Sequence, residues 1–301
     1  MDLLKITNLG KKDLKDLLKK TDILKEKKIR GKPHKELESK SVGLLFEEPS
    51  TRTRISFSVG CSDLGMHSLY LKEEDLQIRR GENIKDTGNV ISRYLDSLVI
   101  RALDHQKIKK LAQHSTIPII NAMSKKYHPC QAIADLYTIK EKKDQLRDLK
   151  FAWIGDANNV CNSNILGNSM MDIETRIASP KGYEPEKKVI KEAQKYQGDI
   201  KIFNDPYKAV EDSDIIYTDV WISTGDDRDP SEIKQDFKEF KVTQELVNQA
   251  KPDAIVMHCM PIKGNEITRE VVESTQSVIY DQAENRLHTE KALLLKLLKQ
   301  N

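Results

Sequence analysis

Short apolar runs alternate with helical patterns from about residue 41 to the end of the 301-residue chain. This alternation is typical of βαβ units, in which helices join parallel strands. The first half contains four such runs, and the second contains four strong runs and a weaker one. We expect strands at 41–47, 67–71, 97–103, 117–121, 150–155, 175–179, 214–219, 254–259 and, from the weaker run, 277–280. The pattern predicts an α/β protein of two domains, each a parallel β-sheet flanked by helices.

The boundary between the domains is expected within the charged stretch 138–150, which follows a predicted helix and precedes the next strand. Apolar residues recur at helical spacing over 84–95 and again over 287–298. We expect the C-terminal helix to return to the first domain. The predicted domains are therefore 1–143 plus 284–301, and 144–283.

Charge adds a constraint on the ligand. The chain has 50 Lys+Arg and 47 Asp+Glu, a formal net charge of +3, so no field of one sign is available to hold nucleic acid or an anionic membrane. A small anion would need a local cluster of cations. No apolar run approaches the roughly 18 residues of a membrane span, and the N-terminus lacks a secretory signal pattern. We expect a cytoplasmic protein with neither nucleic acid nor a membrane as partner.

The four cysteines are Cys61, Cys130, Cys161 and Cys259, and no two of them form a CxxC pair. This spacing argues against a zinc ribbon, a thioredoxin motif and a disulfide framework, and it predicts free thiols. The acidic turn 223–232 lacks the spacing of a calcium loop. We predict no metal site.

The segment FEEPSTRTRISF (46–57) lies where the first strand should end and a helix should begin. Pro49 can set the turn, and Ser50 or Thr51 can cap the helix. Helix N-termini bind phosphate, and the hydroxyl and guanidinium side chains of 50–54 add further donors. We predict an anion site here, and the alternative is a capped helix with exposed arginines.

The same helix has two apolar stripes. Ile55 and Val59 form one, and Phe57, Cys61 and Leu64 form the other. We therefore expect the helix to be covered on two sides.

Two further positions, one at Arg101 and one around His128, could contribute to binding an anion. Arg101 lies near the carboxyl end of an apolar strand, where a cation needs either a ligand or a buried carboxylate partner. His128 precedes Pro129, a residue suited to the first position of a helix, and Gln131 follows. A histidine at such a place can also be structural.

The motifs STRTR, HPCQ and HCMP occur in this order, with Arg101 between the first two. Together they resemble the carbamoyltransferase family over nearly the whole chain. The second half is similar to the ornithine members in particular, through WIGDANNV, SPKGYEPE, TDVWIS, HCMP and QAENR. The aspartate members share EPSTRTR but would not be expected to have the cysteine of HCMP or the DVWIS loop.

The resemblance implies carbamoyl phosphate binding in the first domain, ornithine binding in the second and an active site in the cleft between them. It assigns carbamoyl phosphate to Ser50, Thr51, Arg52, Thr53, Gln77, Arg101, His128, Gln131, Cys259, Met260 and Arg286. It assigns ornithine to Asn159, Asp219, Ser223 and Thr224. The loop 74–82 reaches a neighbouring subunit in relatives, which implies a homotrimer or a multiple of trimers with shared active sites.

The implied reaction is attack of an amine on the carbamoyl carbon, with departure of phosphate. It requires neither cofactor nor metal, because phosphate is already a good leaving group. The implied catalytic residues are Arg101 and His128, which stabilise the developing oxyanion, and Asp219 and Cys259. The last two follow strands 214–219 and 254–259, and we hypothesise that they orient the attacking nitrogen.

Three positions depart from the family pattern, namely Ala157, Asn162 and Thr224. They leave the acceptor open among ornithine, aspartate, putrescine and N-acylated ornithine. A nucleotide-binding dehydrogenase is a different alternative, but GDANNV lacks the GxGxxG glycines. A non-catalytic scaffold is another, and the argument against it is the joint presence of Arg52, Arg101, His128, Asp219 and Cys259.

Overall fold

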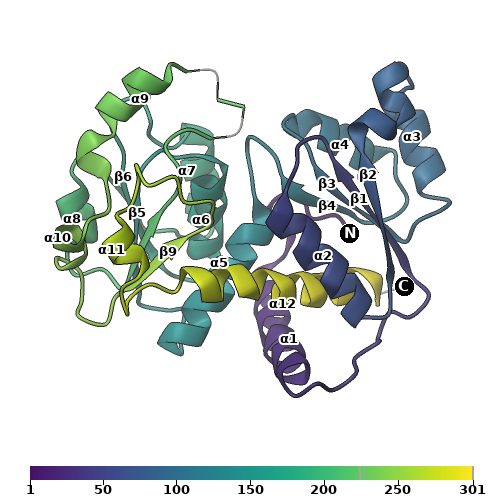
Figure 1. The fold of residues 1–301 in the computed structure, drawn as a ribbon, viewed down its shortest axis with the longest axis horizontal. Helices are drawn as coiled ribbons and strands as arrows, with labels where there is room; N and C mark the ends of the chain where they lie inside the picture. Colours follow the sequence, from purple (N-terminus) through teal and green to yellow (C-terminus); the bar gives the residue numbers. More distant parts are fainter. Residues whose placement is uncertain (224, 227, 300–301) are drawn as a thin grey trace. The chain divides into compact units, whose positions relative to one another are not determined.

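The chain folds into two compact units, which are residues 1–137 with 284–301, and residues 138–283. The computed structural model, drawn in Figure 1, describes residues 1–223, 225–226 and 228–299, apart from the side chains of 78 and 79. The chain enters the second unit within helix α5 (Pro129–Lys143) and leaves it within helix α12 (Ile279–Leu298).

The first unit is built on a four-stranded parallel sheet of order β2-β1-β3-β4. Its strands are β1 (Ser41–Phe46), β2 (His67–Lys72), β3 (Ser97–Arg101) and β4 (Ile119–Met123). Besides α5 and α12, its helices are α1 (Lys11–Ile29), α2 (Thr51–Asp63), α3 (Ile84–Ile91) and α4 (His105–Gln113). Short 3₁₀ helices are η1 (Ile6–Asn8), η2 (Glu73–Asp75) and η3 (Gln77–Arg80).

The second unit contains a five-stranded parallel sheet of order β7-β6-β5-β8-β9. Its strands are β5 (Lys150–Ile154), β6 (Glu174–Ala178), β7 (Ile200–Phe203), β8 (Ile215–Thr218) and β9 (Ile255–His258). Its helices are α6 (Asn159–Met170), α7 (Lys187–Gln194), α8 (Pro206–Val210), α9 (Pro230–Asp236), α10 (Gln244–Val247) and α11 (Arg269–Val272), with η4 (Lys238–Phe240).

Central strands read as continuous apolar runs because both faces of a parallel sheet are covered. Leu44 of β1, Val99 of β3 and Ile216 of β8 are fully buried. The edge strands β2 and β7 are only partly buried, and lysines or polar residues interrupt their apolar residues. The predicted α/β architecture of two parallel sheets flanked by helices is confirmed.

Two strand predictions need correction. The run 277–280 is not a strand, because Ser277 forms only an isolated bridge with Val256 and the chain then turns into α12 at Ile279. The prediction missed β7, whose sequence IKIF is short and interrupted by a lysine, as suits an edge strand.

The two-sided covering expected for α2 is wrong for the single chain. Phe57, Cys61 and Leu64 are fully buried, whereas Ile55 is 56% and Val59 36% exposed. Only one stripe packs against the rest of the unit. Ser50 occupies the N-cap position of α2, but its side chain makes no capping hydrogen bond.

The cysteines are free thiols, as the sequence predicts, and Cys61, Cys130 and Cys161 are buried. Burial raises the pKa of all three, to about 12 for Cys61. In the described part of the chain, no helix is long and apolar enough to cross a membrane.

An aromatic cluster in the second unit provides a test of its core. The ring of Phe237 lies 4.6 Å from that of Tyr183 and 5.6 Å from that of Trp221, between centroids. Phe237→Ala removes these contacts and leaves a cavity, so we expect the free energy of unfolding to fall by about 3–5 kcal/mol. Denaturant unfolding should detect this loss, and Tyr207→Ala, which truncates a residue that is 43% exposed, should change stability by less than about 1 kcal/mol. Equal losses in the two variants would contradict this account.

Candidate functional site

In the first unit, the candidate residues lie where strands of the sheet end and helices begin. Arg101 is the last residue of β3, and His128 directly precedes α5. Ser50 and Thr51 mark the start of α2, which follows β1. The carboxyl edge of a parallel sheet is where α/β proteins bind ligands, because strand ends and helix N-termini meet there.

A buried network centred on Arg286 joins three helices of this unit. Arg286 Nη1 donates to Gln131 Oε1 at 2.8 Å, and Nη2 donates to Thr53 Oγ1 at 3.3 Å. Nη2 and Nε also donate to Glu290 Oε1, at 2.6 and 2.9 Å. These contacts connect α12, α5 and α2, and they bring together three residues that the family resemblance assigns to one ligand.

Positive charge accumulates beside this network. Burial, together with the charges of Arg286 and Arg52, lowers the pKa of Arg101 to about 10. Burial and the charges of Arg286, Arg101 and Arg52 lower the pKa of His128 well below its usual value. The imidazole is therefore neutral at physiological pH and stands among three cations, an environment suited to an anion.

The pKa of Arg286 shifts in the opposite direction. Burial alone would lower it, but neighbouring negative charge, above all the Glu290 carboxylate with a smaller contribution from Asp135, more than offsets that effect and the pKa is raised. Arg286 is therefore a fully charged guanidinium inside the protein.

The remaining candidates of this unit are more exposed. Thr51 and Gln77 are exposed, and Ser50 and Arg52 are half-buried. Gln77 lies on η3, and no contact among the described side chains joins it to the Arg286 network.

An ion-pair cluster fixes the segment just before Gln77 to the end of β1. Lys107 of α4 donates to Glu73 Oε1 at 2.5 Å and also to Glu47, whose other oxygen accepts from the Leu103 N–H at 3.0 Å. The sequence analysis missed Lys107, because a lysine on an amphipathic helix is ordinarily solvated surface.

In the second unit, Asp219 directly follows β8 and Cys259 directly follows β9. Ligand-capable atoms of Asp219, His258 and Cys259 lie within 4.8 Å of one another. Asp219 and Cys259 thus share one cluster, and that they orient the attacking nitrogen stays a prediction.

The histidine of this cluster is already committed to protein contacts. His258 Nδ1 accepts from the Met260 N–H at 2.8 Å, so Nε2 carries the hydrogen and faces Glu266 Oε1 at 3.2 Å. A metal at these three residues would have to displace one of these contacts. For the same reason, His258 is poorly placed to act as a base for Cys259.

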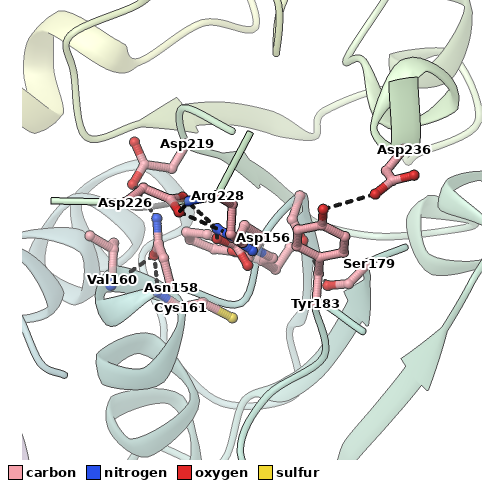
Figure 2. A network of polar contacts seen from close by, with 12 residues as sticks. Asp156, Asn158, Val160, Cys161, Ser179, Tyr183, Asp219, Asp226, Arg228 and Asp236 are labelled. Carbon is pink, nitrogen blue, oxygen red and sulfur yellow. Dashed lines mark hydrogen bonds and ion pairs between the residues drawn. The ribbon is translucent and has the colours of Figure 1, made fainter. Parts of the chain in front are cut away.

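Asn158 is a residue that the sequence analysis missed. Its Nδ2 donates to Asp219 Oδ2 at 2.7 Å, and its Oδ1 caps α6 by accepting from the Val160 and Cys161 N–H groups. Figure 2 shows this amide between the carboxylate and the helix. The predicted Asn159 is the next residue, the first of α6, and it is half-buried. The signal available in the sequence was the position of Asn158 as an N-cap residue.

Arg228 ties the loop after β8 to the end of β5 (Figure 2). Its guanidinium pairs with Asp226 and Asp156, at 2.6 and 2.7 Å, and lies over the ring of Tyr183 at 4.7 Å. Burial raises the pKa of Asp156 even though Arg228 pairs with it. Arg228 therefore compensates an acid that is costly to bury.

The same loop contains two residues that were predicted to bind the acceptor amine. Ser223 is half-buried, and its carbonyl accepts from the Asp226 N–H at 3.2 Å. Thr224 lies outside the described residues.

Met260, which was assigned to carbamoyl phosphate, follows Cys259 after β9. It is half-buried, and its N–H donates to His258 Nδ1.

Family models match both parts of the chain. Residues 1–141 match the aspartate/ornithine carbamoyltransferase carbamoyl-P binding domain, and residues 147–297 match the Asp/Orn binding domain of the same family.

Relatives match over nearly their whole length. An ornithine carbamoyltransferase of Methanosarcina mazei is 49% identical, over 99% of either chain. That of Thermococcus kodakarensis is 45% identical, over 97% of this chain and 95% of the relative. Among solved structures, the ornithine carbamoyltransferase from Pyrococcus furiosus is 43% identical with a TM-score of 0.95, covering 99% of this chain and 97% of that one.

The lowered pKa of His128 predicts a contribution to stability that depends on pH. An unfolded histidine binds a proton below about pH 6.5, whereas folded His128 resists protonation. Stability from the neutral form is thus complete above about pH 6.5 and is lost as the pH falls toward the lower folded pKa. His128→Gln should therefore lose less free energy of unfolding than the unaltered protein between about pH 7 and about pH 5, measured by denaturant titration. The exposed His67→Gln is the control, and parallel curves for all three proteins would refute the prediction.

Proposed function

The chain belongs to the aspartate/ornithine carbamoyltransferase family, and we propose that it transfers the carbamoyl group of carbamoyl phosphate to the side-chain amine of L-ornithine. The products are L-citrulline and phosphate, so the enzyme is a transferase of arginine metabolism. The observation that carries the proposal is the cation cluster of the first unit, in which the charges of buried Arg286 and half-buried Arg52 and Arg101 act on a neutral, buried histidine.

Carbamoyl phosphate binds in the first unit in this proposal. Arg52 neutralises the phosphate, with Ser50 and Thr51 as hydroxyl donors at the start of α2. Arg101 and Thr53 face the carbamoyl oxygen. These donors stabilise the charge that develops when that oxygen becomes an oxyanion. The other residues assigned by resemblance complete this set, namely Gln77, Gln131, Cys259, Met260 and Arg286.

His128 supports this role through its neutrality. A neutral imidazole can donate one hydrogen bond to the carbamoyl oxygen without adding a fourth positive charge among three arginines. Its lowered pKa keeps it in that state.

Ornithine is a cation in solution, and its side-chain ammonium must lose a proton before it attacks. A free alkylamine has a pKa of about 10.4. Asp219 and Cys259 lie within one cluster and provide a carboxylate and a sulfur that orient the nitrogen. Asn158 holds the Asp219 carboxylate, and Asn159, Ser223 and Thr224 are the further acceptor residues in this proposal. After the ammonium has lost one proton to solvent, the neutral nitrogen forms its bond to the carbamoyl carbon. The bond from that carbon to the phosphate oxygen breaks, and phosphate leaves with the second proton that the nitrogen releases.

Assembly into trimers or multiples of trimers, with the loop 74–82 completing a neighbour's site, is also part of the proposal. It is supported by apolar side chains exposed on the first unit, namely Ile55, Val59, Val90 and Tyr94. Ile55 and Val59 lie one turn apart on α2 and therefore expose one apolar face, and a contiguous exposed apolar patch is typical of an association surface. We place the enzyme in the cytoplasm and propose that it acts without metal or cofactor.

A panel of amines tests the function directly. With carbamoyl phosphate as donor, we expect ureido product and phosphate to form with L-ornithine and much more slowly with aspartate, putrescine or N-acetylornithine. Product is measured by a colorimetric ureido assay. A preference for another amine would change the acceptor, and no consumption of carbamoyl phosphate with any amine would overturn the proposal.

The ion pairs of Arg228 predict that their loss weakens binding of ornithine and not of carbamoyl phosphate. Arg228→Met leaves Asp156 and Asp226 without their shared cation and loosens the loop that carries Ser223. We expect KM for ornithine to rise about tenfold, or about 1.4 kcal/mol, with little change in KM for carbamoyl phosphate. Arg269→Met removes an exposed ion pair on α11 and should leave both constants unchanged. A rise in KM for carbamoyl phosphate alone would refute the assignment.

A further inference from the structure

Glu290 is a buried acid that no motif in the sequence marks. It lies on α12 one turn after Arg286, and it is 1% exposed. Its Oε1 accepts from both Nε and Nη2 of that arginine, at 2.9 and 2.6 Å. A charged pair with this little solvent contact requires good geometry to be tolerated.

The hydrogen bonds of Arg286 limit what it can offer a ligand. A guanidinium has five N–H donors. One goes to Gln131, one to Thr53 and two to Glu290. At most one donor remains, so Arg286 is better placed to orient its neighbours than to bind a phosphate with a bidentate fork.

The arginine also sets the direction of both neighbouring hydrogen bonds. Because Arg286 can only donate, Gln131 must present its oxygen, and its amide nitrogen then donates to Asp135 Oδ1 at 2.9 Å. Thr53 Oγ1 must likewise accept, so its hydroxyl hydrogen is directed to another acceptor. Reversal of either group would place a donor against a donor.

The surroundings of Glu290 make it the natural counter-charge for this arginine. Ser56 and Cys61 of α2 and Cys130 of α5 face the Glu290 carboxylate together with Arg286. The three are uncharged, because burial raises the pKa of both thiols. Without Glu290, Arg286 would lose both of its hydrogen bonds to a carboxylate while remaining a buried cation that repels Arg101.

We propose that Glu290 is a positioning residue for carbamoyl phosphate. Its carboxylate holds Arg286, and Arg286 in turn keeps the donor and acceptor atoms of the Thr53 hydroxyl and the Gln131 amide in the orientation that carbamoyl phosphate binding requires. This inference rests on the proposed function of the first unit. It adds a residue that does not itself contact the substrate.

The experiment compares three full-length variants with the unaltered protein. Glu290→Met removes the carboxylate, Glu290→Gln keeps an oxygen acceptor without the charge, and Lys291→Met is the matched control. Lys291 is the next residue of α12, is fully buried and pairs with Asp63 at 3.1 Å, so its loss removes a buried ion pair of the same helix without breaking a contact of Arg286. Calorimetry measures the Kd for carbamoyl phosphate, steady-state kinetics measures both KM values, and a thermal melt measures stability.

We expect Glu290→Met to weaken carbamoyl phosphate binding about 10- to 100-fold, which is the scale for misplacing an orienting group. Glu290→Gln should recover part of that loss, and KM for ornithine should change less than KM for carbamoyl phosphate. Lys291→Met should lower the melting temperature with an unchanged Kd. If Glu290→Met does not fold, the comparison of Glu290→Gln with Lys291→Met decides.

Two negative results are distinguishable. If the unaltered protein binds carbamoyl phosphate and a Glu290 variant binds it equally well while melting at a lower temperature, Glu290 is only structural and the inference is wrong. If the unaltered protein does not bind carbamoyl phosphate, the proposed function fails first and this inference fails with it.

Discussion

Burial of positive charge at the edge of a parallel sheet is the constraint on which the first unit depends. Arg101 and Arg286 lie close enough for each charge to oppose the other, and Arg52 adds to the effect. Such a cluster is costly unless counter-charges or a bound anion offset it. Glu290 offsets one of the three cations from within the protein. The site is therefore organised before an anion arrives, and its remaining positive charge is available to attract one.

The second unit gathers negative rather than positive charge. Asp156, Asp219 and Asp226 gather near the carboxyl ends of β5 and β8, and Arg228 is shared between two of them. Asn158 holds the third without adding charge. A cationic amino acid suits such a surplus of carboxylates, as a phosphate suits the arginines of the first unit. The near-neutral net charge of the chain conceals this separation of charge between the units.

The architecture was accessible from the sequence because parallel strands covered on both faces read as apolar runs. Among the described residues, eight of the nine strands follow from apolar runs, and the exception is β7, an edge strand interrupted by a lysine. The strand predicted at 277–280 was wrong because a run of four residues is too short to show whether its period is that of a strand or of a helix. Exposed Ile55 and Val59 show a further limit, since an apolar stripe indicates that a face is suited to burial and does not identify what covers it.

The candidate site was accessible only where chemistry is concentrated in a motif. Arg101 and His128 attract notice because a cation in an apolar strand and a histidine before a helix-starting proline are unusual. Glu290, Asn158 and Arg228 sit among many charged and polar residues, and only their partners make them significant. A glutamate four residues after an arginine on a helix is usually a solvated pair of little energetic consequence. The difference at Glu290 is burial: once α2 and α5 cover the pair, the same spacing fixes the polarity of Thr53 and Gln131. Burial depends on residues far apart in the chain, so local sequence spacing alone does not predict it.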